Sequence, residues 1–240
     1  MARASFKRVL LKLSGEVLAG AQAQALKSDR ADYLAYSLKE ARGLGVELAV
    51  VMGGGNILRG LPASTQGVQR ETADYMGMLA TVINGLALED ALSREGVEAR
   101  VLSSLPVEEV AETYSRRRAL RHLQEGRVVI LVGGTGKPYF STDTAAALRA
   151  AEIKAETLLK ATKVDGVYDA DPLHQPGARC FSCISYMEFI SRRLRVMDTT
   201  AVVLCMENKV PIIVFNMTEG GNLKRVLLGE KVGTLVKEEC

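Results

Sequence analysis

Histidine, cysteine and tryptophan are scarce in this chain, and their scarcity narrows the chemistry that it can perform. The 240 residues include no tryptophan, two histidines and four cysteines. Cys180 and Cys183 form a C-x-x-C pair, but a structural zinc site needs a second pair of cysteine or histidine ligands, and the sequence has none. We therefore expect no protein-bound metal and no redox centre, and the thiols should be ordinary and reduced.

Long hydrophobic runs and a dominant charge are also missing. The apolar stretch near the N-terminus, residues 9–13, is short and contains Lys12, so it fits neither an export signal nor a membrane span. The formal net charge is only +3, and the basic cluster Arg116-Arg117-Arg118 is best explained as a solvated helix face. We accordingly expect a cytoplasmic protein that binds neither membranes nor nucleic acid.

Short β-branched runs alternate along the chain with segments whose apolar residues recur every three or four positions. This alternation predicts an α/β fold in which a central, mainly parallel sheet is covered by helices on both faces. The predicted strands are Arg8–Leu13, Val46–Met52, Ala99–Leu102, Val128–Val132, Thr157–Leu159, Pro211–Phe215 and Gly233–Val236. The predicted helices are Arg30–Leu44, Arg70–Arg94, Ser115–Glu125, Thr144–Ile153, Thr199–Asn208 and Gly221–Leu228. No linker divides the sequence, so we expect a single domain over residues 1–240.

Small or basic residues follow four of these predicted strands. The carboxyl ends of parallel strands meet at one edge of an open α/β sheet, and ligands usually bind there. Consecutive glycines let backbone N–H groups approach a phosphate, and Gly53-Gly54-Gly55 directly after an apolar strand favours a phosphate site over a simple tight turn. The four segments are Ser14-Gly15-Glu16, Gly53-Gly54-Gly55-Asn56, Gly133-Gly134-Thr135-Gly136 and Lys160-Ala161-Thr162-Lys163.

The segment from Gly133 to Lys137 is not a P-loop, although it contains glycines followed by a lysine. The P-loop pattern needs a glycine where this chain has Leu131, and a serine or threonine where it has Pro138. The dinucleotide pattern G-x-G-x-x-G is absent as well. Phosphate binding therefore stays the prediction, but not through either of these motifs.

Two lysines at strand ends are candidates for neutralising phosphate charge. Lys12 lies inside an apolar strand, where an ammonium is costly to bury unless it meets an anion. Lys163 precedes a turn at residues 164–168. An exposed position at a sheet edge is the alternative for either lysine alone, but both on one face fit phosphoryl transfer, which needs positioning and positive charge.

Three further candidates have simple structural alternatives. Ser141-Thr142-Asp143-Thr144 is a good N-cap for the helix that follows, and a capped helix start can also offer N–H groups to a phosphate. Arg59 can hold a phosphate and Asp74 can accept hydrogen bonds from ribose hydroxyls, but each is otherwise a solvated surface charge.

Together these segments resemble the amino acid kinase superfamily and, within it, the bacterial UMP kinases, over about residues 7–236. The residues 73–81 are the discriminating piece, since the other motifs are shared with carbamate and acetylglutamate kinases. The similar motifs are Lys12-Leu13-Ser14-Gly15-Glu16, Gly53-Gly54-Gly55-Asn56 with Arg59-Gly60, Ala73-Asp74-Tyr75-Met76-Gly77-Met78-Leu79-Ala80-Thr81, Phe140-Ser141-Thr142-Asp143-Thr144, Lys160-Ala161-Thr162-Lys163-Val164-Asp165-Gly166-Val167-Tyr168 and Met197-Asp198.

The resemblance implies a UMP kinase that moves the γ-phosphoryl group of ATP to UMP in pyrimidine nucleotide biosynthesis, and it assigns roles to residues. The implied catalytic residues are Lys12, Lys163 and Asp143. The implied ATP-binding residues are Lys12, Leu13, Ser14, Gly15, Gly55, Arg59, Thr162, Tyr168 and Asp171. The implied UMP-binding residues are Gly54, Asp74, Thr135, Gly136, Lys137, Pro138, Tyr139, Phe140, Ser141 and Thr142. An acceptor-binding half at about 1–155 and an ATP-binding half at about 156–240 follow from the same comparison.

The resemblance further implies Mg²⁺ held mainly through the ATP phosphates, inhibition by UTP and a homohexamer. Activation by GTP stays open, because the glycine-rich loop associated with effector binding here reads Ala19-Gly20-Ala21-Gln22-Ala23-Gln24-Ala25, with one glycine. Lys137 stands where the family commonly has asparagine. The alternatives are a related kinase acting on a small acid, of the carbamate or acetylglutamate type, and a non-catalytic nucleotide-binding protein on the same fold.

Overall fold

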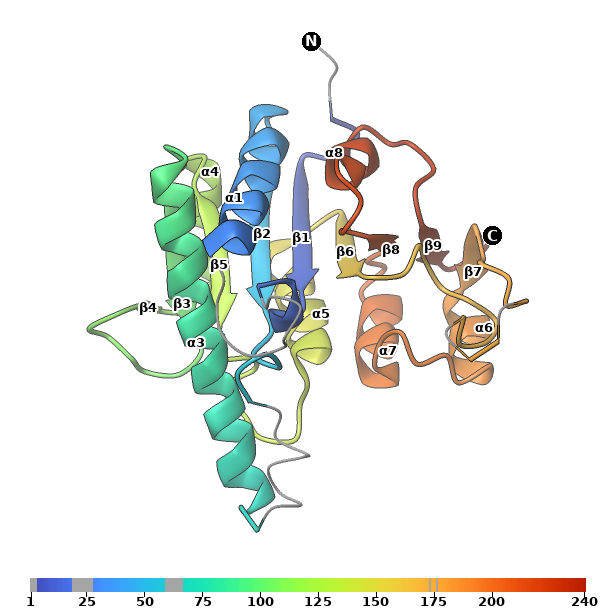
Figure 1. Cartoon of the computed structure of the whole chain (residues 1–240), viewed down its shortest axis with the longest axis horizontal. Coiled ribbons are helices and arrows are strands. Elements are labelled where there is room, and N and C mark those ends of the chain that lie inside the picture. The colour runs from blue at the N-terminus through green and yellow to red at the C-terminus, as the bar shows by residue number, and fades with distance from the viewer. Residues whose placement is uncertain (1–3, 19–27, 59–66, 173, 176) are drawn as a thin grey trace.

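The structure is a computed structural model that describes residues 4–18, 28–58, 67–172, 174–175 and 177–240. These residues form a nine-stranded sheet with the order β4-β3-β5-β2-β1-β6-β8-β9-β7 (Figure 1). Every neighbouring pair is parallel except β8 and β9, so the predicted mainly parallel sheet is confirmed. The strands are β1 (Arg8–Leu13), β2 (Glu47–Met52), β3 (Ala99–Ser103), β4 (Glu112–Thr113), β5 (Val128–Val132), β6 (Thr157–Thr162), β7 (Cys183–Ser185), β8 (Ile212–Asn216) and β9 (Thr234–Lys237).

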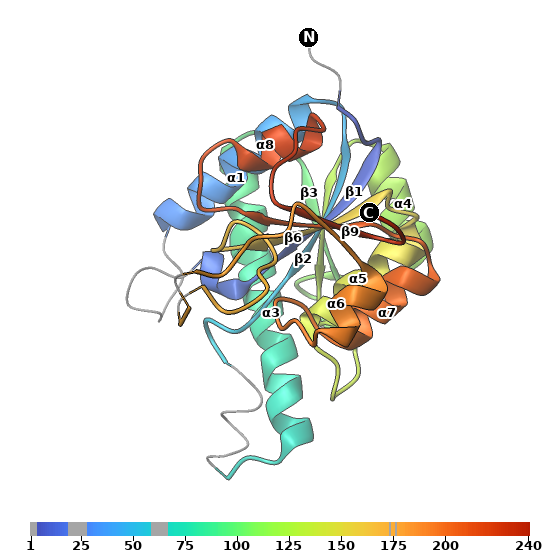
Figure 2. The same ribbon diagram turned by 90° about the vertical axis from the view of Figure 1, so that its right-hand side faces the viewer.

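Helices cover both faces of this sheet, as the sequence predicts (Figure 2). One face is covered by α1 (Ser28–Gly43), α3 (Arg70–Arg94) and α8 (Asn222–Leu227). The other is covered by α4 (Arg116–Gln124), α5 (Thr142–Ile153), α6 (Tyr186–Ser191) and α7 (Thr199–Glu207). Alternate residues of each strand enter one or the other apolar core, so Leu11 of β1 packs on the side of α1 and Leu10 on the side of α5.

The register between the two central strands decides where charged residues meet. Strand β1 pairs in parallel with β6, with Leu10 opposite Leu158 and Lys12 opposite Lys160. Because both leucines belong to the core beneath α5, the period of two places both lysines on that same face of the sheet. Strand β6 continues to Thr162, three residues beyond its predicted end at Leu159.

The structure also contains short elements that the sequence analysis did not predict. These are β4, β7, α6 and the 3-10 turn η1 (Gly15–Val17). Strand β7 has three residues and α6 has six, too few to establish a periodic pattern. The helix α6 is nevertheless well capped, because the Ser185 hydroxyl accepts a hydrogen bond from Glu188 N at 3.1 Å.

The expectation of ordinary reduced thiols is wrong for two of the four cysteines. Cys183 in β7 forms a disulfide with Cys240, with a Cα–Cα distance of 5.8 Å. Cys180 is exposed and Cys205 is buried, and both are free thiols. The C-x-x-C pair is therefore split, with Cys183 joined to Cys240.

Of the helices in the described ranges, none combines the length and apolar character that crossing a membrane requires.

Candidate active site

Two buried lysines share one buried carboxylate at the centre of the sheet. The Nζ atom of Lys12 lies 2.8 Å from Asp143 Oδ1, and Lys160 Nζ also contacts that oxygen. Lys12 and Lys160 are each 7% exposed and Asp143 is 8% exposed, so water does little to screen the three charges. Two ammonium groups against one carboxylate leave an excess positive charge in this cluster, which is a favourable place for an anion.

The charges perturb one another strongly. Burial alone would raise the pKa of Asp143, but the charges of Lys12 and Lys160 outweigh burial and hold this pKa at about 2. Burial and the charge of Lys12 lower the pKa of Lys160 to about 8, against the opposing effect of Asp143. Asp143 is thus a permanent anion at neutral pH, whereas Lys160 is the group whose charge changes near physiological pH.

The N-terminus of α5 brings Asp143 to the two lysines. Ser141 caps the helix, and its hydroxyl accepts hydrogen bonds from Asp143 N at 3.1 Å and Thr144 N at 3.2 Å. The Ser141 hydroxyl also donates to Asp198, the N-cap residue of α7. The capping alternative for this Ser/Thr/Asp segment is therefore real, and the same cap fixes a charged residue of the candidate site.

The first two glycine segments pack against each other at the carboxyl ends of β1 and β2. A Cβ on Gly15 would lie 2.2 Å from Asn56 Oδ1 and 2.8 Å from Gly53 O, so only glycine fits there. The buried Asn84 of α3 donates to Gly53 O at 2.7 Å and exchanges hydrogen bonds with Asn56. These contacts bring the backbone after β1 and the backbone after β2 to one place.

The glycine segment after β5 has positive φ angles and forms hydrogen bonds with two side chains. Gly133, Gly134 and Gly136 have φ angles of 75°, 57° and 77°. The Thr81 hydroxyl accepts from Gly133 N at 2.7 Å, and the Ser104 hydroxyl donates to Gly134 O at 2.9 Å. We name residues 133–137 the acceptor loop, because the resemblance assigns its residues 135–137 to UMP binding.

Asp74 lies beside the continuation of the acceptor loop. Its carboxylate is paired with Arg70 one turn earlier on α3 at 2.8 Å, and it accepts a hydrogen bond from Tyr139 N at 2.9 Å. Tyr139 has a φ of 71° and donates through its hydroxyl to Glu71 at 2.9 Å. Because Arg70 lies 5.8 Å from the centroid of the Tyr139 ring, α3 and the loop after β5 are joined at several points.

Lys163 does not join the buried cluster. Its side chain is 64% exposed and pairs with Glu16 at 3.1 Å, directly after the end of β1. Thr162 bonds back to Val164 O and Phe215 O, and Tyr168 O–H reaches Asp165 at 3.4 Å. Asp171 pairs with His174 at 3.0 Å. Lys163 thus lies at the same edge as Ser14 and Gly15, nearer to the solvent than Lys12.

The structure therefore brings together a set that overlaps the predicted one without matching it. Lys12 and Asp143 meet as expected, and Lys160 takes the place that we expected Lys163 to occupy. The sequence carried no local signal for Lys160, because its position opposite Lys12 follows only from the register between β6 and β1. The predicted phosphate ligand Arg59 lies outside the described residues, as does the segment 19–25.

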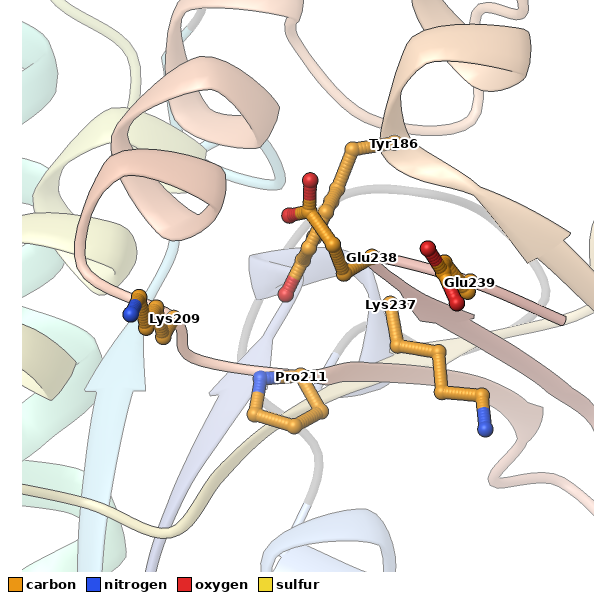
Figure 3. Close-up of a pocket in the computed structure, with 6 residues that line it drawn as sticks. All are labelled: Tyr186, Lys209, Pro211, Lys237, Glu238 and Glu239. Carbon is orange, nitrogen blue, oxygen red and sulfur yellow. The ribbon is translucent and has the colours of Figure 1, made fainter.

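A separate cavity of about 650 Å³ opens at the other edge of the sheet (Figure 3). Pro211 lies just before β8, and Lys237 ends the antiparallel β9, so this cavity faces away from the glycine segments. The Tyr186 hydroxyl in its wall donates to Val210 O at 2.6 Å. The remaining lining residues are Lys209, Glu238 and Glu239.

Comparison with known proteins gives a consistent result. The model of the amino acid kinase family matches residues 7–216. The crystal structure of UMP kinase from Bacillus anthracis is 39% identical with a TM-score of 0.95, covering 98% of this chain and 97% of that one. UMP kinase from Ureaplasma parvum is 36% identical with a TM-score of 0.91, covering 97% and 99%. Uridylate kinase from Archaeoglobus fulgidus is 28% identical with a TM-score of 0.75, covering 95% and 99%.

Proposed function

The chain belongs to the amino acid kinase family and, within it, to the UMP kinases, and we propose that it transfers the γ-phosphoryl group of ATP to UMP, giving ADP and UDP. The observation that carries this proposal is the buried Lys12–Asp143–Lys160 cluster near the carboxyl ends of the central strands β1 and β6. An excess positive charge beside glycine segments suits two phosphorylated substrates placed end to end. The product supplies pyrimidine nucleotide biosynthesis.

The chemistry needs positive charge rather than a base. The attacking oxygen belongs to the UMP phosphate, which is already ionised at neutral pH, so no side chain has to remove a proton. Lys12 and Lys160 neutralise the charge on the phosphoryl group as it moves, and Asp143 keeps both ammonium groups in place. Lys163, at the rim of the same edge, approaches the phosphates of ATP from the solvent side.

The order of the strands divides the sheet into two halves. Strands β1–β5 lie together on one side and β6–β9 on the other, which supports an acceptor-binding half at about 1–155 and an ATP-binding half at about 156–240. On the acceptor side, Gly54, Asp74 and residues 135–142 bind UMP. Thr162, Tyr168 and Asp171 of the second half bind ATP, together with residues 12–15, Gly55 and Arg59 of the first half.

Mg²⁺ fits this site as a companion of the ATP phosphates. In the part of the chain that the structure describes, no three histidine, cysteine, aspartate or glutamate side chains cluster in a way that could hold a metal. Asp143, the acidic residue of the buried cluster, already contacts two lysines. The ion, when bound with ATP, supplies further positive charge to the phosphates, and the protein contributes the lysines and backbone N–H groups around it.

Self-association through α3 is part of the proposal, with a homohexamer as the assembly. Tyr75, Met76, Leu79 and Ile83 are between 42% and 48% exposed and form one apolar stripe on this helix. A second copy of the chain that covers the stripe would bury it. We further propose that UTP inhibits the enzyme and that the enzyme works in the cytoplasm. A response to GTP is left to experiment.

The test is ADP release from ATP and Mg²⁺ with UMP, with CMP, with carbamate or acetylglutamate, and without acceptor. UMP should support turnover far better than the other acceptors. Lys12→Met should lower kcat by at least about 100-fold, because a charge that stabilises the transferring group is lost. Lys39→Met is the matched control, since Lys39 pairs with Glu95 on the surface and should leave turnover unchanged.

Two results would contradict the proposal. Turnover with a small acid but not with UMP would place the chain with the small-acid kinases. ATP binding without any turnover would make it a nucleotide-binding protein. Near-normal turnover by Lys12→Met would refute the role of the buried cluster while leaving the substrate assignment standing.

A further inference from the structure

Arg149 on α5 is a buried arginine that the chemistry above does not use. It is 7% exposed, and a guanidinium in such a place needs partners for its donors. One amino group pairs with Glu152 at 2.6 Å, and the guanidinium carbon lies 3.7 Å from the centroid of the Tyr114 ring. Tyr114 donates its own hydroxyl to Glu152, so the arginine is held on two sides.

The other amino group of Arg149 reaches the acceptor loop through a single hydroxyl. Its Nη2 donates to Ser104 Oγ at 2.9 Å, and Ser104 Oγ donates to Gly134 O at 2.9 Å. Arginine has donors only, so it can bond to the serine only through the oxygen lone pairs. The serine proton is therefore directed to the loop carbonyl, and Arg149 fixes the direction of that bond.

We propose that Arg149 and Ser104 are positioning residues that orient the peptide between Gly134 and Thr135 for UMP. In a trans peptide the C=O and N–H groups point in opposite directions. The hydrogen bond from Ser104 to the Gly134 carbonyl therefore points the Thr135 N–H away from Ser104, to the opposite side of the acceptor loop. We propose that UMP binds on that side. Glycine at 134, with φ of 57°, leaves this peptide free to rotate unless something holds it.

The packing of the loop fits such a role. A Cβ on Gly136 would lie 3.0 Å from Ser104 O, so the loop rests directly on the backbone of Ser104. Ser104 N in turn donates to Val132 O at 3.0 Å, which ties the serine to the end of β5, where the loop begins. The series of contacts from Glu152 through Arg149 and Ser104 to Gly134 thus joins the C-terminal half of α5 to the proposed UMP site. The inference rests on the function proposed above.

The experiment measures steady-state kinetics of Ser104→Ala, Ser104→Thr, Arg149→Met and the Ser104→Ala/Arg149→Met double variant. Ser104→Ala should raise the KM for UMP about fivefold to tenfold and leave the KM for ATP within about twofold, since one neutral hydrogen bond to the loop is lost. Ser104→Thr keeps the hydroxyl and should restore the UMP KM. The double variant should match Arg149→Met, because both residues act through Gly134. Arg116→Met is the control, since Arg116 bonds to Glu152 O but not to Ser104.

Each contrary outcome is distinct. A UMP KM within about twofold of wild type in Ser104→Ala would overturn the inference, as would equal rises in both KM values or a threonine variant as impaired as the alanine one. Multiplying effects in the double variant would show that the two residues act separately and would overturn it too. If the wild-type enzyme released no ADP with UMP, the proposed function itself would fail, and the variants would show no UMP-dependent difference at all.

Discussion

Replacing Lys160 with methionine should stabilise the free protein at neutral pH, although it should also remove most of the activity. The buried cluster contains two ammonium groups and one carboxylate, so one positive charge has no counter-charge within it. The variant removes that charge and keeps the ion pair between Lys12 and Asp143 at 2.8 Å. Methionine has a similar length and adapts to irregular space, so it should fill the position without an ionised head group.

The size of the effect follows from the titration of Lys160. Burial and the charge of Lys12 lower its pKa from the ordinary 10.5 to about 8 in the folded protein. The unfolded chain then binds the proton more tightly between these two values, so stability rises as the pH increases from about 8 to 10.5. With about 1.4 kcal/mol for each pH unit, the lowered pKa of Lys160 destabilises the folded protein by about 3 kcal/mol at pH 7 and by about 1 kcal/mol at pH 9.5, where the folded-state lysine is already largely neutral.

Denaturant unfolding of wild type and Lys160→Met at pH 7 and pH 9.5 tests this reasoning. The stability gap between the two proteins should change by about 2 kcal/mol between the two pH values, with the variant's advantage larger at pH 7. Packing differences between lysine and methionine do not depend on pH and cancel in this comparison. Lys163→Met, at an exposed lysine of the same edge, is the control and should give a constant gap. A constant gap for Lys160→Met would refute the reasoning.

Three further changes have defined outcomes. Asp74→Asn should raise the KM for UMP about tenfold with little change in the KM for ATP, because the carboxylate that we propose as the acceptor for the ribose hydroxyls is lost; equal values in wild type and variant would exclude this role. Cys240→Ser should lower the unfolding free energy of the oxidised protein by about 4 kcal/mol, since the disulfide spans 57 residues; identical denaturation midpoints, with and without a reductant, would contradict this. Gly54→Ala should impair both folding and activity, because its Cβ would lie 2.6 Å from Gly77 O and 2.9 Å from Ala80 Cβ; wild-type values in a thermal melt and an ADP assay would show that α3 moves aside easily.

Much of the fold could be predicted because its long elements repeat one pattern many times. Helix α3 runs from Arg70 to Arg94, as predicted, and β5 coincides with the predicted Val128–Val132. Twenty-five residues of helix, or a fully apolar strand, are difficult to mistake for other structures. Strand β7 and helix α6 were missed because three residues and one capped turn give no period to detect. The disulfide joins Cys183 to a residue 57 positions away, and no local pattern indicates such a pairing.

Site residues that belong to a local sequence motif could be predicted, whereas Lys160 was missed because its place depends on the register between two strands. The glycine segments can be recognised in the sequence, because runs of glycine directly after apolar strands indicate close backbone approach or positive φ angles. Lys160 and Lys163 are both basic residues in one short segment, and composition cannot separate them. The pairing of β6 with β1 distinguishes the two lysines. Lys160 lies opposite Lys12 beneath α5, whereas Lys163 lies beyond the end of β6.

The excess positive charge of the buried cluster links stability to ligand binding. Burial and repulsion by Lys12 together lower the pKa of Lys160, so the protonated cluster destabilises the folded protein. A phosphate group brought between the lysines would supply the missing negative charge, and the ammonium of Lys160 would then be stabilised by an anion. The repulsion that destabilises the folded protein without ligand is relieved when phosphate groups bind, so the same charges strengthen the binding of ATP and UMP. This explains why two lysines are buried against a single aspartate, since a neutral pair would stabilise the fold better but would attract the two polyanions less.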